Sequence, residues 1–284
     1  MASAIRSTPA RSMGVTNLTW AFVERQANLW KRYWAWEVVW LVYGVVNTLA
    51  VTFIAKEAGE LQLLDAAAVD ELVLFLLLGT LAWAYLSAVI DDISMVLSWE
   101  RWEGTIEHTL MAPVARALHL AGMVIFAILH GTVRTVLIGA IALLFFRDVD
   151  FSQADWGAAL LVLLLGSISA AGLAIIAGVL PLLYPERGSQ MTMVIQVSLL
   201  LVSGVYYRAE VLPEWMQTLS RLSPLTYILD GIRGAIQHGE SVVDLWPELL
   251  ILLVSGAVLV PLGLAIFDAA ERWAKKTGRL KRMG

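Results

Sequence analysis

Residues 156–180 read WGAALLVLLLGSISAAGLAIIAGVL, a run of 25 residues without a charged side chain. A bilayer core about 30 Å thick requires roughly 20 apolar residues in a helix. Leu160–Leu165 lacks the alternating polarity of a barrel strand, and lipid offers no partner for unpaired backbone groups. The segment therefore predicts a transmembrane helix.

Five further stretches have the same character. The six predicted spans are Trp36–Ile54, Val69–Ile90, Leu118–Phe146, Trp156–Leu180, Met191–Tyr207 and Leu249–Phe267. The whole chain is 59% hydrophobic and 15% charged, against about 45–50% and about 25% in soluble domains. We therefore expect an all-α polytopic membrane protein, which excludes most classes of soluble enzyme.

Charge and cysteine content exclude further classes. The net charge of −4 provides no basic field for nucleic acid. The absence of cysteine rules out disulfides and thiolate metal sites. Fourteen Lys and Arg lie in segments 1–34, 91–117, 181–190 and 268–284, and five lie in the alternate connections. This asymmetry predicts that both termini are cytoplasmic.

The two ends of the chain carry distinct patterns. We expect residues 1–15 to be a disordered tail and residues 16–34 to form an amphipathic helix with several Trp on one face. That helix is expected to lie on the inner leaflet, and packing on a cytoplasmic partner is compatible with this. Residues 268–284 form a basic tail suited to setting topology and contacting anionic lipid.

The connection after the second span, residues 98–113, reads SWERWEGTIEHTLMAP. We expect the second span to continue as helix to Glu103 and Gly104 to break it. Thr105 is expected to cap a short new helix, and Pro113 to end it. A short polar helix that projects from a membrane bundle suits docking on a soluble partner. The alternative is a solvated loop without a partner.

Residues 208–248 are too apolar for a plain loop and too interrupted for a span. Pro213 and Pro224 each begin a predicted short helix. Asp230 and Arg233 stand at i and i+3 on the second one, where an ion pair is geometrically easy. We expect a re-entrant hairpin between spans five and six, roughly over residues 208–240.

Polar and aromatic side chains inside the spans predict either the lining of a translocation path or hydrogen-bonded packing between helices. Both interpretations stay open. The candidate residues for a translocation path are Trp36, Trp40, Tyr43, Asn47, Arg134, Gln196 and Ser203. Arg134 lies near the middle of its span, so it should face away from lipid. It either pairs inside the protein or contacts an anionic substrate group.

Two motifs carry a family resemblance. Glu103-Gly104-Thr105-Ile106-Glu107, followed by Pro113 and Arg116, resembles the E-G-T-[LI]-E…P…R pattern of ABC type-2 exporter permeases, including the daunorubicin-resistance class. Leu212–Trp215 and Ser223–Arg233 resemble the L-P-x-W and S-P-L-T-Y-x-x-D-x-x-R stretches of the same family.

The resemblance implies roles for both motifs. Residues 100–113 would be the coupling helix, which docks on an ATPase through Arg101, Glu103, Gly104, Thr105, Ile106 and Glu107. The outer hairpin would be a gate that contains Tyr206, Tyr207, Pro213, Trp215, Pro224, Tyr227, Asp230 and Arg233.

The chain contains no G-x-x-x-x-G-K-[ST] motif, so we expect no enzyme activity and no cofactor bound by this chain. The resemblance implies ATP-Mg on a separate ATPase subunit present in two copies, a second permease copy or a homologous one, and a prokaryotic inner membrane. Several Trp suggest an amphipathic drug or lipid as substrate. Polysaccharide or glycolipid export is the alternative, followed by gradient-driven secondary transport, which calls for carboxylates inside the spans.

Overall fold

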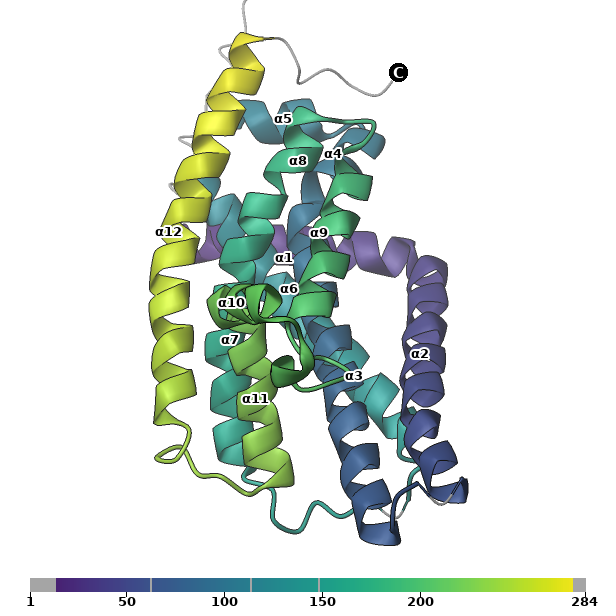
Figure 1. Ribbon diagram of the computed structural model, residues 1–284. Helices are drawn as coiled ribbons and strands as arrows, with labels where there is room; N and C mark the ends of the chain where they lie inside the picture. Colours follow the sequence, from purple (N-terminus) through teal and green to yellow (C-terminus); the bar gives the residue numbers. More distant parts are fainter. Residues whose placement is uncertain (1–13, 62, 113, 148, 278–284) are drawn as a thin grey trace, which may run out of the picture.

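The computed structural model describes residues 14–61, 63–112, 114–147 and 149–277, and over these residues it is helical and has no β-strand. Five helices are long and apolar enough to cross a membrane, and they run alongside one another (Figure 1). They are α2 (Trp34–Glu60), α3 (Ala66–Ser94), α6 (Arg116–Ala142), α7 (Trp156–Ala177) with its continuation α8 (Val179–Leu183), and α12 (Trp246–Lys276). The predicted all-α polytopic fold is confirmed.

The fifth predicted span is shorter than expected. Helix α9 covers Gly188–Val202, 15 residues, or about 22 Å at 1.5 Å per residue. The prediction extended it to Tyr207, but the chain turns at Gly204, whose φ is +73°. Glycine is favoured there because a side chain strains this left-handed conformation.

The centre of the bundle is α7, which packs on α12, α11 (Pro224–Gln237) and α3. Small residues permit this close approach. A Cβ at Gly172 would come within 2.9 Å of the α12 backbone at Val260, and one at Gly166 within 2.6 Å of the Ile228 side chain. Most of the large buried cluster lies around α7 and α3.

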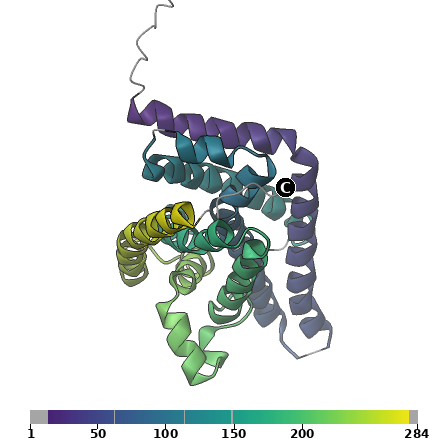
Figure 2. The ribbon, with the colours of Figure 1, turned by 90° about the horizontal axis from the view of Figure 1, so that it is seen from above.

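Helix α1 (Val15–Arg32) runs across the spans rather than along them, as Figures 1 and 2 both show. It packs on α6, where a Cβ at Gly122 would lie 2.6 Å from Cβ of Phe22. Trp20 and Trp30 are exposed. The helix matches the predicted range to within two residues, and its contact with the inner leaflet stays a prediction.

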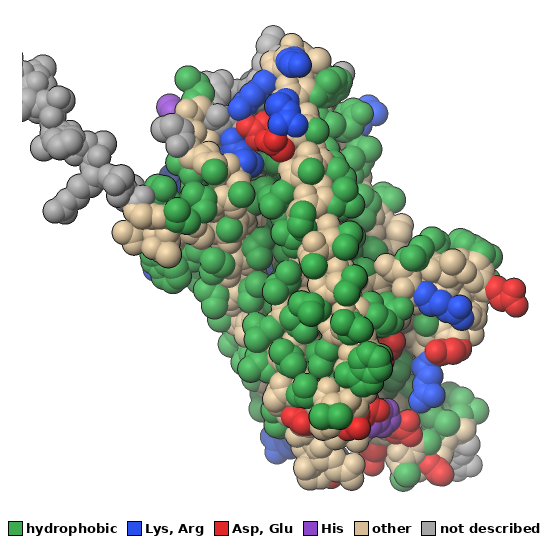
Figure 3. Space-filling view, turned by 90° about the vertical axis from the view of Figure 1, so that its left-hand side faces the viewer, with side chains coloured by type: hydrophobic (Ala, Val, Ile, Leu, Met, Phe, Trp, Pro, Cys, Tyr) green, Lys and Arg blue, Asp and Glu red, His purple; other side chains and the backbone are tan. Residues whose placement is uncertain are grey.

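Short helices fill the connections at both ends. α4 (Val96–Trp102) and α5 (Ile106–Met111) lie between α3 and α6. The 3₁₀ helix η1 (Ala209–Val211), then α10 (Glu214–Leu222) and α11, lie between α9 and α12. In Figure 1, α10 lies beside the middle of the spans. Figure 3 shows a face with apolar side chains over its middle and charged ones at its upper and lower ends and on the protrusion at its right.

The predicted end of the second span needs correction, and other predictions concern residues that the structure does not describe. The second span ends at Ser94 rather than Glu103, because Met95 interrupts the helix before α4 begins. Residues 1–13 and 278–284, as well as Pro113, lie outside the described residues, so their predicted roles do too. Lys275 and Lys276 of the predicted basic tail form the last turn of α12.

Candidate functional site

The bend between α4 and α5 is held by hydrogen bonds between backbone groups. Gly104 has a φ of +73° and breaks the helix as predicted. Its N–H donates to the Arg101 carbonyl, and the Thr105 N–H donates to the Glu100 carbonyl at 2.8 Å. The predicted side-chain cap at Thr105 is wrong. The Thr105 hydroxyl instead accepts a hydrogen bond from Arg25 Nη2 at 2.9 Å.

Arg101 faces into the protein, although the resemblance placed it at the partner surface. Its side chain is among the largest that are fully buried, with 1% of the residue exposed. Nη1 donates to the Pro181 carbonyl at 2.9 Å and Nη2 to the Leu182 carbonyl at 2.7 Å. Arg101 therefore holds α4 against α8 and offers no surface to a partner.

Glu100 is a charged group that sequence reasoning missed. It is 2% exposed, and its Oε1 accepts from Arg25 Nη1 at 2.7 Å and lies 3.2 Å from His119 Nε2. Burial raises the pKa of the Glu100 carboxyl, but His119 and Arg25 outweigh this and leave the pKa below its usual value. Glu100 therefore joins α4 to α1 and α6.

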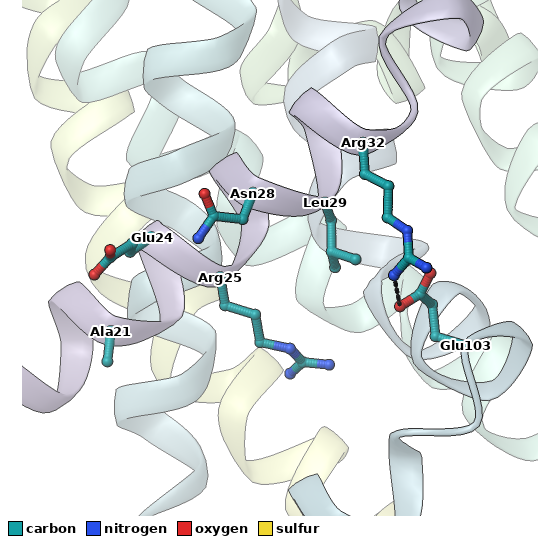
Figure 4. A pocket seen from close by; sticks show the side chains of 7 residues that line it. All are labelled: Ala21, Glu24, Arg25, Asn28, Leu29, Arg32 and Glu103. Atoms are coloured by element: carbon teal, nitrogen blue, oxygen red, sulfur yellow. Dashed lines mark ion pairs between the residues drawn. The ribbon is translucent and has the colours of Figure 1, made fainter.

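Glu103 lies directly before the bend and contacts the junction of α1 and α2. The Tyr33 hydroxyl donates to Glu103 Oε1 at 2.5 Å, and Arg32 Nη1 lies 4.0 Å from Oε2. Figure 4 shows Arg25 and Arg32 extending from α1 toward this segment. The shallow, open groove of about 520 Å³ beside them is lined by Ala21, Glu24, Arg25, Asn28, Leu29, Arg32 and Glu103.

The coupling segment leaves two large apolar side chains mostly exposed. Met111 is 82% exposed and Trp102 61%. Ile106 is buried, and the side chain of Glu107 lies outside the described part of the structure. We call residues 96–111, which comprise α4, the bend and α5, the coupling segment.

A second ion pair anchors the C-terminal helix beside this segment. Arg116, in the first turn of α6, donates through Nε and Nη2 to the Glu271 carboxylate at 2.8 and 3.0 Å. Lys275 Nζ lies 2.8 Å from the same carboxylate. Arg116 Nη1 also lies 3.3 Å from His119 Nδ1. The coupling segment, α6 and α12 thus share one polar network.

In the outer hairpin, Arg233 is 7% exposed and bonds to backbone oxygens. Nη1 donates to the Gly204 carbonyl at 2.9 Å and Nη2 to the Val205 carbonyl at 2.7 Å. The guanidinium also lies 3.6 Å from the Phe75 ring centre. Arg233 and Asp230 form no ion pair within 4.0 Å, because Arg233 turns to the carbonyls that the Gly204 turn leaves open.

The other predicted gate residues do not converge on one point. The hydroxyls of Tyr207 and Tyr227 donate to carbonyls six residues earlier in the chain, those of Leu201 and Arg221. Tyr206 accepts from Asn47 Nδ2 at 3.4 Å. The remaining three are Pro213, which precedes α10, buried Pro224 at the start of α11, and Trp215, which is 66% exposed.

The predicted path residues differ in their exposure. Trp36, Trp40 and Tyr43 are exposed on α2 and touch edge to face. Arg134 pairs inside the protein, with Nη2 donating to the Trp40 carbonyl at 3.0 Å.

Gln196 and Ser203 are buried in hydrogen-bonded packing. Gln196 Nε2 donates to Asp91 Oδ1 at 2.6 Å, and the hydroxyl oxygen of Ser203 lies 3.1 Å from that of Ser223.

A further polar cluster escaped sequence reasoning. His130 Nδ1 lies 2.6 Å from Asp92 Oδ2, and Nε2 lies 3.2 Å from Glu37 Oε2. The three residues come from α6, α3 and α2, at chain separations that no local pattern reveals. The cluster joins the inner part of α2 to the bundle.

The described structure has a bundle of apolar helices, a small helical segment held by buried charges, and a helical hairpin between α9 and α12. These features define a multi-pass membrane protein. Residues 17–236 match the model of the ABC-2 type transporter family, and the chain belongs to that family.

Curated relatives agree with this. The chain is 26% identical over 159 residues to the inner membrane transport permease YadH of Escherichia coli strain K12, which is 56% of this chain and 60% of that protein. Proteins of the same name from E. coli O157:H7 and Shigella flexneri match equally. The chain thus spans about three-fifths of the length of the relatives it matches.

Proposed function

We propose that this chain is the permease subunit of an ATP-driven exporter and that its coupling segment docks on a separate ATPase subunit. One observation carries the proposal. Glu100 and Arg101 hold the segment from inside, while Trp102 and Met111 are left exposed. A segment that is pinned on its inner face and exposes large apolar side chains suits docking in a cleft of another subunit.

The energy source belongs to the partner. The chain has no phosphate-binding loop, so ATP-Mg would bind on the ATPase subunits. Membership of the ABC-2 family supports an assembly of two ATPases and two permeases. The excess of Lys and Arg in segments 1–34, 91–117, 181–190 and 268–284 supports a cytoplasmic location of both termini. The likeness to an inner membrane permease of Escherichia coli supports a prokaryotic inner-membrane location.

The substrate is proposed to be an amphipathic drug or lipid. The exposed row of Trp36, Trp40 and Tyr43 on α2 supports this, because aromatic faces pack on apolar groups while their polar edges contact headgroups. A polysaccharide or glycolipid is the alternative substrate, for which aromatic side chains would also serve.

One observation favours a second candidate, gradient-driven transport. The Asp92–His130–Glu37 cluster places titratable groups within the spanning helices, where proton-coupled transporters carry them. Proteoliposomes of the purified chain alone, given a proton gradient and rhodamine 6G, test it. Dye movement without an ATPase would overturn the exporter proposal.

The docking test reverses a charge on the coupling segment. Glu107→Lys should abolish retention of the ATPase subunit during purification of the tagged permease from its native host. The matched control is Glu214→Lys on exposed α10, at the outer hairpin, which should retain the ATPase at the wild-type level.

Equal retention by both variants, with both chains folded and inserted, would remove the coupling segment from the docking surface. Loss of the ATPase from both would show that the charge reversal acts through general destabilisation.

A further inference from the structure

The junction between α1 and α2 is a single residue. α1 ends at Arg32 and α2 begins at Trp34, with Tyr33 between them at φ −109° and ψ 28°. The two helices run in very different directions (Figure 1). Because one residue joins them, a displacement of Tyr33 changes the direction in which α2 leaves.

The part of α2 next to this junction is loosely attached to the bundle. The buried residues of α2 are Gly44, Thr48, Thr52 and Ala55, which all lie beyond its first ten residues. Within those first ten residues, Trp36, Val39 and Tyr43 are more than half exposed. Two polar contacts join this part of α2 to α6. His130 Nε2 lies 3.2 Å from Glu37 Oε2, and Arg134 Nη2 donates to the Trp40 carbonyl at 3.0 Å. Few packing contacts therefore resist a swing of this end.

Glu103 links the coupling segment to the junction between α1 and α2. Its carboxylate accepts from the Tyr33 hydroxyl at 2.5 Å, and the Glu103 side chain is 14% exposed. The hydrogen bond to this carboxylate raises the pKa of the Tyr33 phenol. The Tyr33 ring lies 5.3 Å from that of Trp102 and 5.9 Å from that of Trp99.

Glu103 also lies where the coupling segment bends. It caps the C-terminus of α4 and directly precedes Gly104, so its carboxylate lies at the bend between α4 and α5. Arg25 binds the same segment at Glu100 and Thr105. Among the described residues, α1 and the residue that follows it therefore contact the coupling segment through Arg25, Arg32 and Tyr33, and Tyr33 directly precedes α2.

We infer that Glu103 and Tyr33 form a latch that transmits movement of the coupling segment to the inner end of α2, so that Glu103 is a positioning residue rather than a contact for the ATPase. The inference rests on the proposed function, since it takes the ATPase as the source of the movement. It assigns Tyr33, which no motif singles out, to the coupling machinery.

The test uses the permease–ATPase complex in nanodiscs. The chain has no native cysteine, so Val39→Cys, on the exposed side of α2, takes a single bimane label. Trapping the complex with ATP and vanadate should change the bimane emission in the otherwise wild-type chain. Tyr33→Phe and Glu103→Gln should each abolish this change while retaining the ATPase and its hydrolysis rate. The double variant should behave as either single variant does.

The matched control is Tyr184→Phe, which removes a phenol hydroxyl at the end of α8. Tyr184 is 46% exposed, and its hydroxyl has no hydrogen-bond partner among the described residues. This variant should keep the full change in emission. A change that persists in Tyr33→Phe and Glu103→Gln would overturn the latch, and so would its absence from the wild-type complex.

Loss of the ATPase from Glu103→Gln would also overturn the latch, because it would make Glu103 a docking residue. Failure of the wild-type chain to retain any ATPase is a separate result, and it would defeat the proposed function itself.

Discussion

Arg101 and Arg233 perform the same task in two different surroundings. Each is buried, and each donates through both terminal nitrogens to two successive carbonyl oxygens, those of Pro181 and Leu182 or those of Gly204 and Val205. In both places the acceptors lie at an interruption between helices, where carbonyl groups lack helical partners. A buried arginine thus secures each of the helical insertions between the spans.

The neighbours of the two arginines differ. Around the coupling segment the polar contacts are ionic, as in Arg25–Glu100. Around the outer hairpin the buried polar contacts are between neutral groups, as in Ser203–Ser223, and the ion pair of Arg208 with Glu71 is exposed. We therefore expect buried ion pairs to matter more for stability around the coupling segment, and close packing to matter more around the outer hairpin.

The largest effect is expected from Arg233→Met. It leaves the Gly204 and Val205 carbonyls without a charged donor in a region that water reaches poorly, and should cost about 3 kcal/mol. Arg101→Met should cost about as much, because Arg101 is 1% exposed and Arg233 is 7% exposed. Thermal unfolding in detergent, followed by tryptophan fluorescence, measures both. A much smaller loss for Arg101→Met would show that water replaces the lost donor there.

Gly79→Ala should have the next largest effect. The added Cβ would lie 2.1 Å from the Val205 carbonyl oxygen and 2.7 Å from Arg233 Nη2, so the outer turn must shift, at a cost of about 2 kcal/mol. Gly139→Ala on α6 is the control, since its Cβ would come no nearer than 3.5 Å to Leu81. That control should unfold at the wild-type temperature or above it. A stable Gly79→Ala variant would mean that the turn is pliable.

Glu100→Gln should cost about 2 kcal/mol at pH 7, because it removes the partner of Arg25 and His119. The folded-state pKa of Glu100 is lowered, so its contribution is present above the unfolded pKa of about 4.5 and is lost as the pH falls through the folded value. The unfolding temperatures of wild type and variant should converge below pH 4.5. Exposed Glu24→Gln should show no difference over this range, and a constant gap for Glu100→Gln would count against the ionic account.

Asp230→Asn should have the smallest effect, under about 0.5 kcal/mol. Asp230 is exposed, and Arg233 bonds to carbonyl groups instead of to it. The same unfolding assay applies. A loss above about 1 kcal/mol would restore the ion pair that the i, i+3 spacing predicted.

Local features of the chain were predictable from sequence. Apolar runs place the spans, and the helix break at Gly104 and the helix start at Pro224 follow from the backbone preferences of those residues. These preferences depend only on residues a few positions apart, so they can be recognised in a single sequence.

Contacts between distant segments were not predictable. Glu103 and Tyr33 are 70 residues apart, and Arg101 and Pro181 are 80 apart. The motif that contains Glu103 and Arg101 indicated a surface for a partner, yet both side chains face inward, because helix packing decides which neighbours a charged group meets. For Arg233 the local i, i+3 rule favoured Asp230, and the open carbonyls of a distant turn were the stronger acceptors.

The shortness of α9 gives the surrounding lipid a part in the behaviour of the protein. Its 15 residues extend about 22 Å, roughly 8 Å less than an average hydrocarbon core. Acyl chains beside α9 must shorten or tilt, or the outer hairpin must fill the missing layer. Longer acyl chains would increase this mismatch, so the thickness of the host bilayer becomes a physical variable that acts on the hairpin without any ligand.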